Sequence, residues 1–205
     1  METRKLLFAL AALAILAAPS FAAPTVTTQS SSPHPWAPIK VTGAEIGSFY
    51  TFCVEWDVTQ SNRTYYYTID DEVKFGGSSS ALASETQKIF RAYQLGNLDS
   101  WSAAQIQHEI WFHEGAPEQY ENSLGQTVDG GLDFGIASWL SEQDPSLTAG
   151  WHTVKVLNLW KTEAGIYTVD GDVQSMLIYV PTPGAILLAG IGTTLVGVLR
   201  RRKTI

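Results

Sequence analysis

Residues 64–95 read TYYYTIDDEVKFGGSSSALASETQKIFRAYQL, and the hydrophobic period of this stretch changes halfway along it. Its first part, Thr64–Ile69, is rich in aromatic and β-branched residues, a composition typical of a strand. Two glycines and three serines then predict a loop. Beyond the loop, residues 81–95 carry apolar side chains at helical spacing and are followed by a glycine that can end a helix. The chain is therefore expected to pass here from a β region into a helical region.

The same change of pattern is visible on both sides of this stretch. Upstream, Ile46–Val58 is aromatic and β-branched and predicts a strand. Downstream, a serine followed three residues later by glutamine predicts a capped helix over Ala103–His113. A third, short helix is expected over Phe134–Glu142. Thr153–Trp160 and Ile166–Val169 are β-like, and Val173–Val180 leads into the C-terminal tail.

The order of strands, then helices, then strands predicts an α+β fold. We expect a β-sandwich or barrel-like domain with a helical insertion, spanning residues 39–180 and followed by a C-terminal transmembrane helix. Residues 23–38 are rich in Ser, Thr and Pro and predict a flexible leader. The ordered part is long enough to bury one hydrophobic core.

The N-terminal residues 1–22 have the pattern of a secretory signal peptide. Two basic residues precede an apolar run from Leu6 to Ala18, and Ser20-Phe21-Ala22 has the small-x-small pattern of a cleavage site. Cleavage is therefore expected after Ala22. The apolar run is short for a membrane span, although an uncleaved N-terminal anchor is the alternative.

The C-terminal residues 181–205 predict a membrane segment of unusual form. Pro181-Thr182-Pro183 is followed by an uncharged apolar stretch, 184–199, and then by Arg200, Arg201, Arg202 and Lys203. A helix of this length spans roughly 24 Å, less than a hydrocarbon core of roughly 30 Å. The basic cluster is expected to stay cytoplasmic, which leaves the upstream domain outside the membrane.

This tail resembles the PEP-CTERM sorting signal that exosortases process in bacteria with a Gram-negative-type envelope. Thr182 stands where that family usually has Glu. The resemblance implies export to the cell envelope or surface, with a C-terminal membrane anchor that is present at least transiently, and an exosortase-type processing enzyme as a partner. A plain C-terminal anchor is the alternative.

Charge and cysteine content exclude several classes of protein. The chain of 205 residues has a formal net charge of −7, but residues 23–180 hold 7 basic and 19 acidic residues, a net charge of −12. Such a surface argues against nucleic acid and favours cationic or neutral partners. The single cysteine, Cys53, excludes an intramolecular disulfide framework and any zinc site built on two or four cysteines. No cofactor and no metal site are predicted.

Cys53 is a candidate functional residue, because an unpaired thiol in an exported protein is buried, bridged to another chain or used in chemistry. It lies in Phe52-Cys53-Val54, and Ile106-Gln107 followed by Ile110-Trp111 comes about fifty residues later. These two segments resemble the paired motifs of bacterial surface thioester domains, an aromatic-Cys-aliphatic strand and an aliphatic-Gln-x-x-aliphatic-Trp segment. The resemblance extends from about residue 46 to about residue 160.

The resemblance implies that the sulfur of Cys53 and the side-chain carbonyl of Gln107 form an internal thioester. A thioester is an activated acyl group that a nucleophile can attack once without turnover, with an amine favoured over a hydroxyl as the partner. The implied role is adhesion or attachment to a surface or matrix, and not enzymatic catalysis. The bond must be kept from water, and the aromatic residues close to the two motifs in sequence are expected to shield it: Phe52, Trp56, Trp111 and Phe112.

Two other functions stay open. The chain can be a structural or matrix surface protein in which Cys53 is buried and inert, since free cysteine is among the most buried residue types. Alternatively, Cys53 and His108 can form a thiol hydrolase dyad, which also needs an orienting residue and an oxyanion hole. We assign no role to Glu55 and Asp57, which are expected on a strand face different from that of Cys53.

Two further groups of residues lack the pattern of a metal site. His108 and His113 are separated by five residues, which places their imidazoles about 140° apart on a helix, so they cannot ligate one zinc ion together. Asp70-Asp71-Glu72 and Asp170-Gly171-Asp172 provide too few ligands for calcium and are interpreted as solvated turns.

Overall fold

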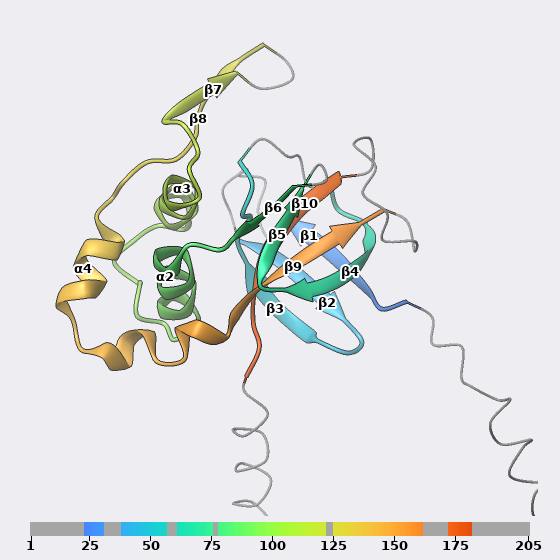
Figure 1. The fold of residues 1–205 in the computed structure, drawn as a ribbon, viewed down its shortest axis with the longest axis horizontal. Coiled ribbons are helices and arrows are strands. Elements are labelled where there is room, and N and C mark those ends of the chain that lie inside the picture. The colour runs from blue at the N-terminus through green and yellow to red at the C-terminus, as the bar shows by residue number, and fades with distance from the viewer. Residues whose placement is uncertain are drawn as a thin grey trace, which may run out of the picture.

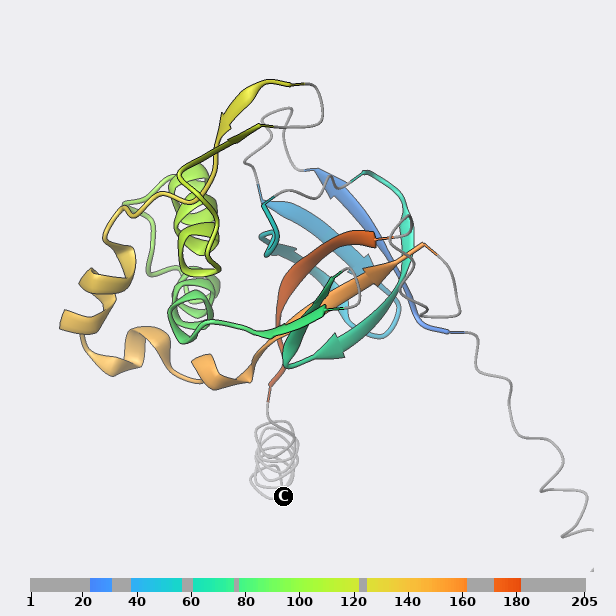
Figure 2. The same cartoon turned by 45° about the horizontal axis from the view of Figure 1, so that its top comes forward.

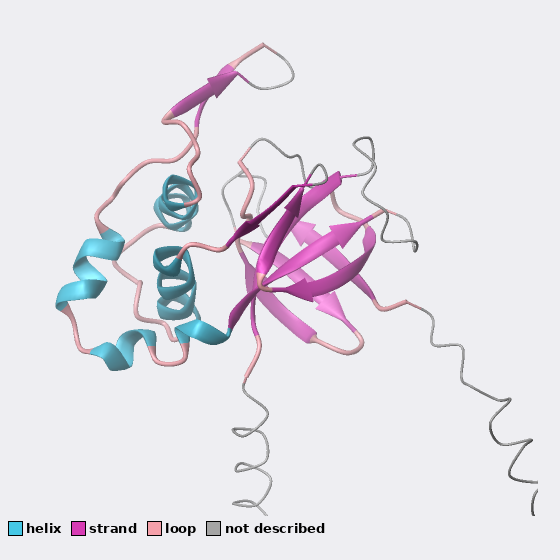
Figure 3. Ribbon diagram, viewed as in Figure 1, coloured by secondary structure: helices cyan, strands magenta, loops and turns pink. Residues whose placement is uncertain are grey.

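The computed structural model describes residues 23–30, 38–56, 61–75, 78–121, 125–161 and 172–181. Its helices gather on one side of the molecule and its main sheet lies on the other (Figures 1 and 3). The described strands are β1 (Thr25–Ser30), β2 (Ile39–Gly43), β3 (Gly47–Thr51), β4 (Thr64–Asp70), β5 (Glu72–Phe75), β6 (Ser78–Ala81), β7 (Gln119–Glu121), β8 (Thr127–Asp129), β9 (Val154–Trp160) and β10 (Asp172–Tyr179). The described helices are α2 (Ser84–Gln94), α3 (Ala103–His113), α4 (Ile136–Glu142) and two 3-10 turns, η1 (Pro145–Thr148) and η2 (Trp151–Thr153).

The main sheet has six strands in the order β10-β9-β4-β1-β2-β3, and every neighbouring pair is antiparallel. It curls into a half-barrel, and β5–β6 and β7–β8 form separate two-stranded hairpins. The helices are inserted between β6 and β9. The predicted α+β class with a helical insertion is therefore confirmed, and the β part is a half-barrel rather than a closed barrel or a sandwich.

The start of the domain differs from the sequence-based expectation. Thr25–Ser30, which the sequence analysis places in a flexible leader, forms β1 in the interior of the sheet, between β4 and β2. Val26 and Thr28 are buried while their neighbours are exposed, so the strand alternates as a half-buried strand does. The leader prediction is therefore wrong for these residues, because their Ser/Thr composition concealed this alternation. Residues 31–37 lie outside the described part of the chain.

Two strand predictions also need correction. The strand expected over Ile46–Val58 ends at Thr51, and the chain then continues with Cys53 in an isolated bridge to β10. The serines after the glycine pair, predicted as a loop, form β6 and pair with β5 as a hairpin. In both places the backbone found hydrogen-bond partners that local composition does not reveal.

The helices follow their sequence signals closely. α3 begins and ends where predicted, and the capping box is present: the Ser102 hydroxyl accepts from the Gln105 N–H, and the Gln105 side chain accepts from the Ser102 N–H. α2 starts three residues later than the predicted start at residue 81, and α4 starts two residues later than predicted. Of the three helices, α3 carries the residues of the candidate site, and its bounds are the ones predicted.

Buried apolar side chains form two cores that meet along β9 and β10. The helix-side core lies between the helices and the sheet and includes Phe52, Val54, Ile89, Phe90, Ile106, Ile110, Ile136, Val154, Val156 and Leu177. The sheet-side core is formed mainly by side chains of the main sheet and includes Val26, Val41, Cys53, Tyr65, Trp111, Leu157, Leu159, Met176 and Ile178. The segment around Cys53 contributes to both cores, and it therefore lies at their junction.

The predicted signal peptide, residues 1–22, the β-like segment expected at Ile166–Val169 and the predicted span, 184–199, lie outside the described residues. Within the residues that the structure does describe, none of the helices combines the length and apolar character that crossing a membrane requires.

Candidate functional site

Cys53 sits on an extended segment that is hydrogen bonded to β10 through its neighbours. The N–H of Val54 donates to the carbonyl of Ser175 at 2.9 Å, and the N–H of Leu177 donates to the carbonyl of Phe52 at 3.2 Å. In an extended chain, successive residues present their backbone groups to opposite edges. The N–H and C=O of Cys53 therefore face away from β10, toward the helices.

The side chain of Gln107, in the middle of α3, occupies this open edge. The backbone N–H of Cys53 donates to Oε1 of Gln107 at 2.9 Å, and Nε2 of Gln107 donates to the carbonyl of Cys53 at 2.8 Å. A backbone N–H can only donate and a carbonyl can only accept, so the two partners determine which way the amide points. The structure thus brings together the two residues that the paired motifs single out.

Both residues are withdrawn from solvent. Cys53 is 6% exposed and Gln107 is 4% exposed. Phe52 and Val54 pack in the helix-side core while Cys53 packs in the sheet-side core, as expected for alternate residues of an extended segment. The carboxamide of Gln107 is therefore held beside the backbone of the one residue that carries a thiol.

The protonation state of Cys53 follows from its surroundings. Burial raises the pKa of the Cys53 thiol well above its ordinary value, and the nearby Glu55 carboxylate raises it further. Catalytic cysteines instead have lowered pKa values and partial exposure, because the thiolate is the nucleophile. Cys53 has neither property, because it is buried and its pKa is raised, and this disfavours the thiol hydrolase alternative.

Glu55 is a residue that the sequence analysis missed. Its carboxylate accepts the N–H of Ser175 at 2.6 Å, its backbone carbonyl accepts Nε2 of Gln174 at 2.6 Å, and its side chain is buried. Residues two apart on an extended segment share a face, so spacing alone could have placed Glu55 near Cys53. Expecting it on a different face was wrong. Asp57 lies outside the described residues.

Two of the four predicted shielding residues lie in the cores on either side of the Cys53–Gln107 contact. Phe52 is fully buried in the helix-side core, where its ring meets that of Tyr93 edge to face at 4.8 Å. Trp111 is buried in the sheet-side core together with Cys53. Four residues advance a helix by about 400°, so Trp111 lies about 40° from Gln107 on α3.

Phe112 does not shield the pair. Its side chain is 40% exposed, and it lies about 140° from Gln107 around the axis of α3. Its ring contacts His113 rather than the site. The prediction failed because proximity in sequence was used without the helical angle.

Trp56 is half-buried and makes an aromatic contact that the sequence does not reveal. Its ring meets Tyr120 of β7 edge to face at 4.7 Å between centroids. The β7–β8 hairpin extends from the helical side of the molecule (Figure 2). Through Tyr120 this hairpin contacts a residue three positions from Cys53.

The base of that hairpin is packed tightly on α3. Nδ1 of His108 lies 2.5 Å from the carbonyl of Gly130, and since a carbonyl only accepts, Nδ1 carries the proton. A Cβ atom at Gly131 would lie 2.6 Å from the backbone of Phe112, so this close approach requires glycine. His108 thus has a structural partner in the carbonyl of Gly130.

Glu109 organises the next helix. Its carboxylate accepts the N–H of Phe134 and the N–H of Ala137, both at 2.8 Å, at the beginning of α4. Burial by itself raises the pKa of Glu109, but the imidazole of His113, 3.7 Å from Oε1, and hydrogen bonds from the backbone at residues 134–137 lower it below the ordinary value. Among the described residues no cluster of His, Cys, Asp or Glu could hold a metal ion.

The acidic turn at Asp70 also serves the fold. Its carboxylate accepts from Thr68, from Nζ of Lys74 at 2.9 Å and from Nδ2 of Asn158 at 3.0 Å. Burial raises the pKa of Asp70, but these hydrogen bonds outweigh burial and lower it. The second acidic motif is described only at Asp172, which begins β10.

The residues of the predicted sorting signal are described only at their start. Pro181, the second residue after the end of β10, is exposed. Pro183, Arg200, Arg201 and Arg202 lie outside the described residues.

Comparison with protein-family models, with curated proteins and with solved structures found no match for this chain. Its function is therefore argued from its residues and their geometry.

Proposed function

We propose that this chain is an exported cell-surface protein in which Cys53 and Gln107 form an internal thioester that reacts once with a nucleophile. The observation that carries the proposal is the two-point contact between the Gln107 carboxamide and the backbone of Cys53. Two motifs chosen from sequence, 54 residues apart, meet side chain to backbone in a buried setting.

The contact supports this proposal because it holds the carboxamide of Gln107 beside Cys53. The sulfur of Cys53 adds to Cδ of Gln107, and negative charge develops on Oε1, which the N–H of Cys53 stabilises as an oxyanion donor would. Nε2 takes up the thiol proton and a C–N bond breaks. The products are a C–S bond and one molecule of ammonia, so all atoms and charges balance.

The reaction with a partner follows the same geometry. A primary amine attacks Cδ of Gln107, an amide bond forms and the C–S bond breaks. Because the pKa of the Cys53 thiol is raised, sulfur leaves as a neutral thiol that takes a proton from the attacking amine. An amine is a stronger nucleophile than a hydroxyl at neutral pH, which favours an amine on a surface or matrix as the partner.

Burial keeps water from the bond until a partner arrives. Phe52 and Trp111 pack in the two cores beside the contact, and Trp56 and Tyr120 form an aromatic pair near it. The proposed export by residues 1–22 and anchoring by residues 181–205, with an exosortase-type enzyme acting on the tail, would present this domain at the cell envelope. The role is covalent adhesion without turnover.

A structural role for the same contact is the second candidate. The two hydrogen bonds of Gln107 also satisfy backbone groups of Cys53 that would otherwise be buried without partners. The raised pKa of Cys53 fits an inert thiol equally well. In that case the chain is a surface or matrix protein whose glutamine joins α3 to the sheet.

Intact mass of the purified exported protein distinguishes these two candidates. Thioester formation removes ammonia and lowers the mass by about 17 Da, and methylamine then adds about 31 Da. Cys53→Ala and Gln107→Ala should each abolish both changes, whereas Gln105→Ala, a glutamine of the same helix outside the site, should keep them. An unmodified mass together with an alkylatable Cys53 would leave the structural role.

A further inference from the structure

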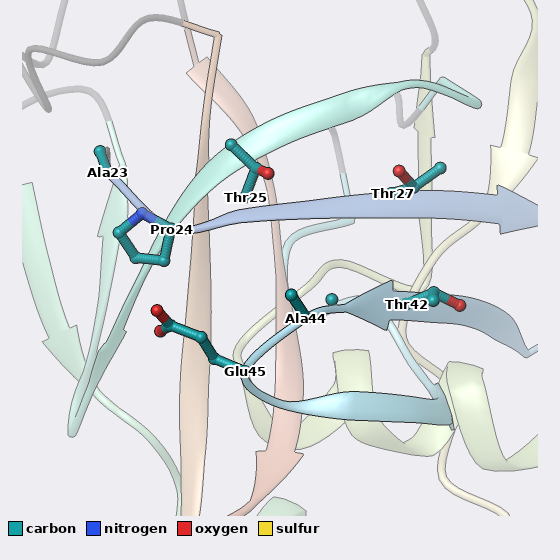
Figure 4. Close-up of a pocket in the computed structure, with 8 residues that line it drawn as sticks. Ala23, Pro24, Thr25, Thr27, Thr42, Ala44 and Glu45 are labelled. Atoms are coloured by element: carbon teal, nitrogen blue, oxygen red, sulfur yellow. The ribbon is translucent and has the colours of Figure 1, made fainter. Parts of the chain in front are cut away.

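A cavity of about 420 Å³ opens where β1 begins, and neither Cys53 nor Gln107 is among the residues that line it. Figure 4 shows the side chain of Glu45 reaching from the β2–β3 turn toward Pro24. Among the described residues that line the cavity, Glu45 is the one with a charge. The lining residues are Ala23, Pro24, Thr25, Thr27, Thr42, Gly43, Ala44 and Glu45.

The backbone at this point is held in place. The N–H of Tyr67 in β4 donates to the carbonyl of Pro24 at 3.3 Å. A residue before proline is restricted to extended conformations, which limits where the nitrogen of Ala23 can lie. The hydroxyl of Tyr67 donates to Oε2 of Glu45 at 3.4 Å, so one strand contacts both the start of the chain and the carboxylate.

The surroundings of Tyr67 also shift its own pKa. Burial raises the pKa of Tyr67, and the Glu45 carboxylate raises it further. This direction is the one expected when an ionised carboxylate lies beside the phenol. The phenol of Tyr67 therefore lies beside the Glu45 carboxylate at the edge of the cavity.

Removal of the signal peptide would create the complementary charge. Hydrolysis of the bond between Ala22 and Ala23 consumes one water molecule, leaves a carboxylate on the signal peptide and converts the amide nitrogen of Ala23 into a primary amine. The pKa of such an amine is about 8, so it carries a positive charge at neutral pH. In the unprocessed chain the same nitrogen is neutral.

We propose that this cavity is a binding site for the primary ammonium group of the processed N-terminus, Ala23, with the carboxylate of Glu45 as its partner. The inference rests on the export step of the proposed function and is independent of the thioester. It connects processing with the fold, because β1 starts only two residues after Ala23 and lies between β4 and β2. Cleavage would then complete a contact that holds the interior strand of the sheet.

The test uses the full chain, secreted and processed by a bacterial host. N-terminal sequencing and intact mass first establish the N-terminus. Thermal unfolding is then compared for the parent and for a chain with Gly-Ser inserted between Ala22 and Ala23, each of them unchanged, with Glu45→Gln and with Tyr67→Phe. The insertion keeps a positive N-terminus but moves it away from the cavity.

An ion pair with an exposed carboxylate has a modest effect, so Glu45→Gln should lower Tm by about 1–3 °C in the parent. In the chain with the insertion, Glu45→Gln should lower Tm by clearly less than it does in the parent. Tyr67→Phe removes the hydroxyl contact to Glu45 without altering the ammonium group, and it should have the same effect with and without the insertion.

Each outcome decides a separate point. An N-terminus other than Ala23 would overturn both the export step as drawn and this site. An N-terminus at Ala23 with equal effects of Glu45→Gln in both backgrounds would overturn the site and leave the export step standing. Neither result alters the mass test of Cys53 and Gln107.

Discussion

Gln107 and Glu109 lie two positions apart on α3, and each extends a buried polar side chain to the backbone of another segment. Gln107 contacts the backbone of Cys53 through its amide. Glu109 accepts two backbone N–H groups at the start of α4 through its carboxylate. Each therefore joins α3 to a neighbouring part of the fold.

The difference between the two contacts lies in their chemistry. A carboxylate is a poor electrophile and Glu109 meets only backbone donors and His113, so its contact can only be structural. The carboxamide of Gln107 is an acyl group with a leaving nitrogen, and it lies against a residue that carries a thiol. Glu109 thus serves as an internal reference for a structural contact, against which a reactive one at Gln107 can be recognised.

The largest expected loss of stability is at Glu109. Glu109→Ala should lower the free energy of unfolding by about 3 kcal/mol, because it leaves buried N–H groups at the start of α4 without an acceptor. Urea denaturation measures this change, and the intact mass of the folded fraction should still show the loss of ammonia. A loss of stability below about 1 kcal/mol would contradict a structural role for this carboxylate.

Gln107→Ala should lower the free energy of unfolding by about 2 kcal/mol, because two buried backbone groups of Cys53 lose their partners. Unlike Glu109→Ala, it should also abolish the loss of ammonia. Gln105→Ala, which removes half of an exposed capping box, is the matched control and should cost about 1 kcal/mol with the loss of ammonia retained. The two variants have the same mass before any loss of ammonia. Equal measured masses would therefore show that Gln107 is not needed for this loss, and its contact would not differ in kind from that of Glu109.

The pH dependence of stability separates the two contacts further. Backbone hydrogen bonds and the nearby His113 hold the pKa of Glu109 below its ordinary value in the folded chain, so its contribution is present above the unfolded-state pKa and is lost as pH falls through the lower folded-state pKa. Glu109→Gln should therefore reduce the loss of stability in acid, as measured by denaturation between neutral pH and pH about 3. Gln107→Ala removes no titrating group there and should leave the slope unchanged.

The smallest expected effect is at Phe112. Its exposed side chain lies away from the contact, so Phe112→Ala should change the free energy of unfolding by no more than about 0.5 kcal/mol and leave the rate of thioester hydrolysis unchanged. Trp111→Phe, which opens space beside Gln107, should speed hydrolysis. Time-resolved intact mass in buffer measures both, and faster hydrolysis in the Phe112 variant alone would reverse our assignment of the shield.

Much of the fold could be predicted because local signals agreed with it. The capping box at Ser102 and the helical period determined α3, and the β-branched run determined β9. β1 was missed because its Val26 and Thr28 give only two buried positions within a polar composition. Whether such a segment forms a strand depends on its long-range partners, which a single sequence does not show.

The site shows the same limits. Cys53 and Gln107 could be selected from their motifs, although the contact itself runs through the backbone of Cys53, which no motif describes. Glu55 could have been found from its spacing of two residues, and Phe112 excluded from its helical angle. The contact of Tyr120 with Trp56 depends on how a hairpin packs, and no local pattern predicts it.

The central claim is tested most directly by peptide mapping of the folded, exported protein with tandem mass spectrometry at mildly acidic pH. The account predicts a cross-linked pair of peptides, one containing Cys53 and one containing Gln107, about 17 Da lighter than their sum, which methylamine separates into a free thiol and a methylamide at Gln107. Two linear peptides, with an intact carboxamide at Gln107 and a thiol at Cys53 that is alkylated after unfolding, would contradict it.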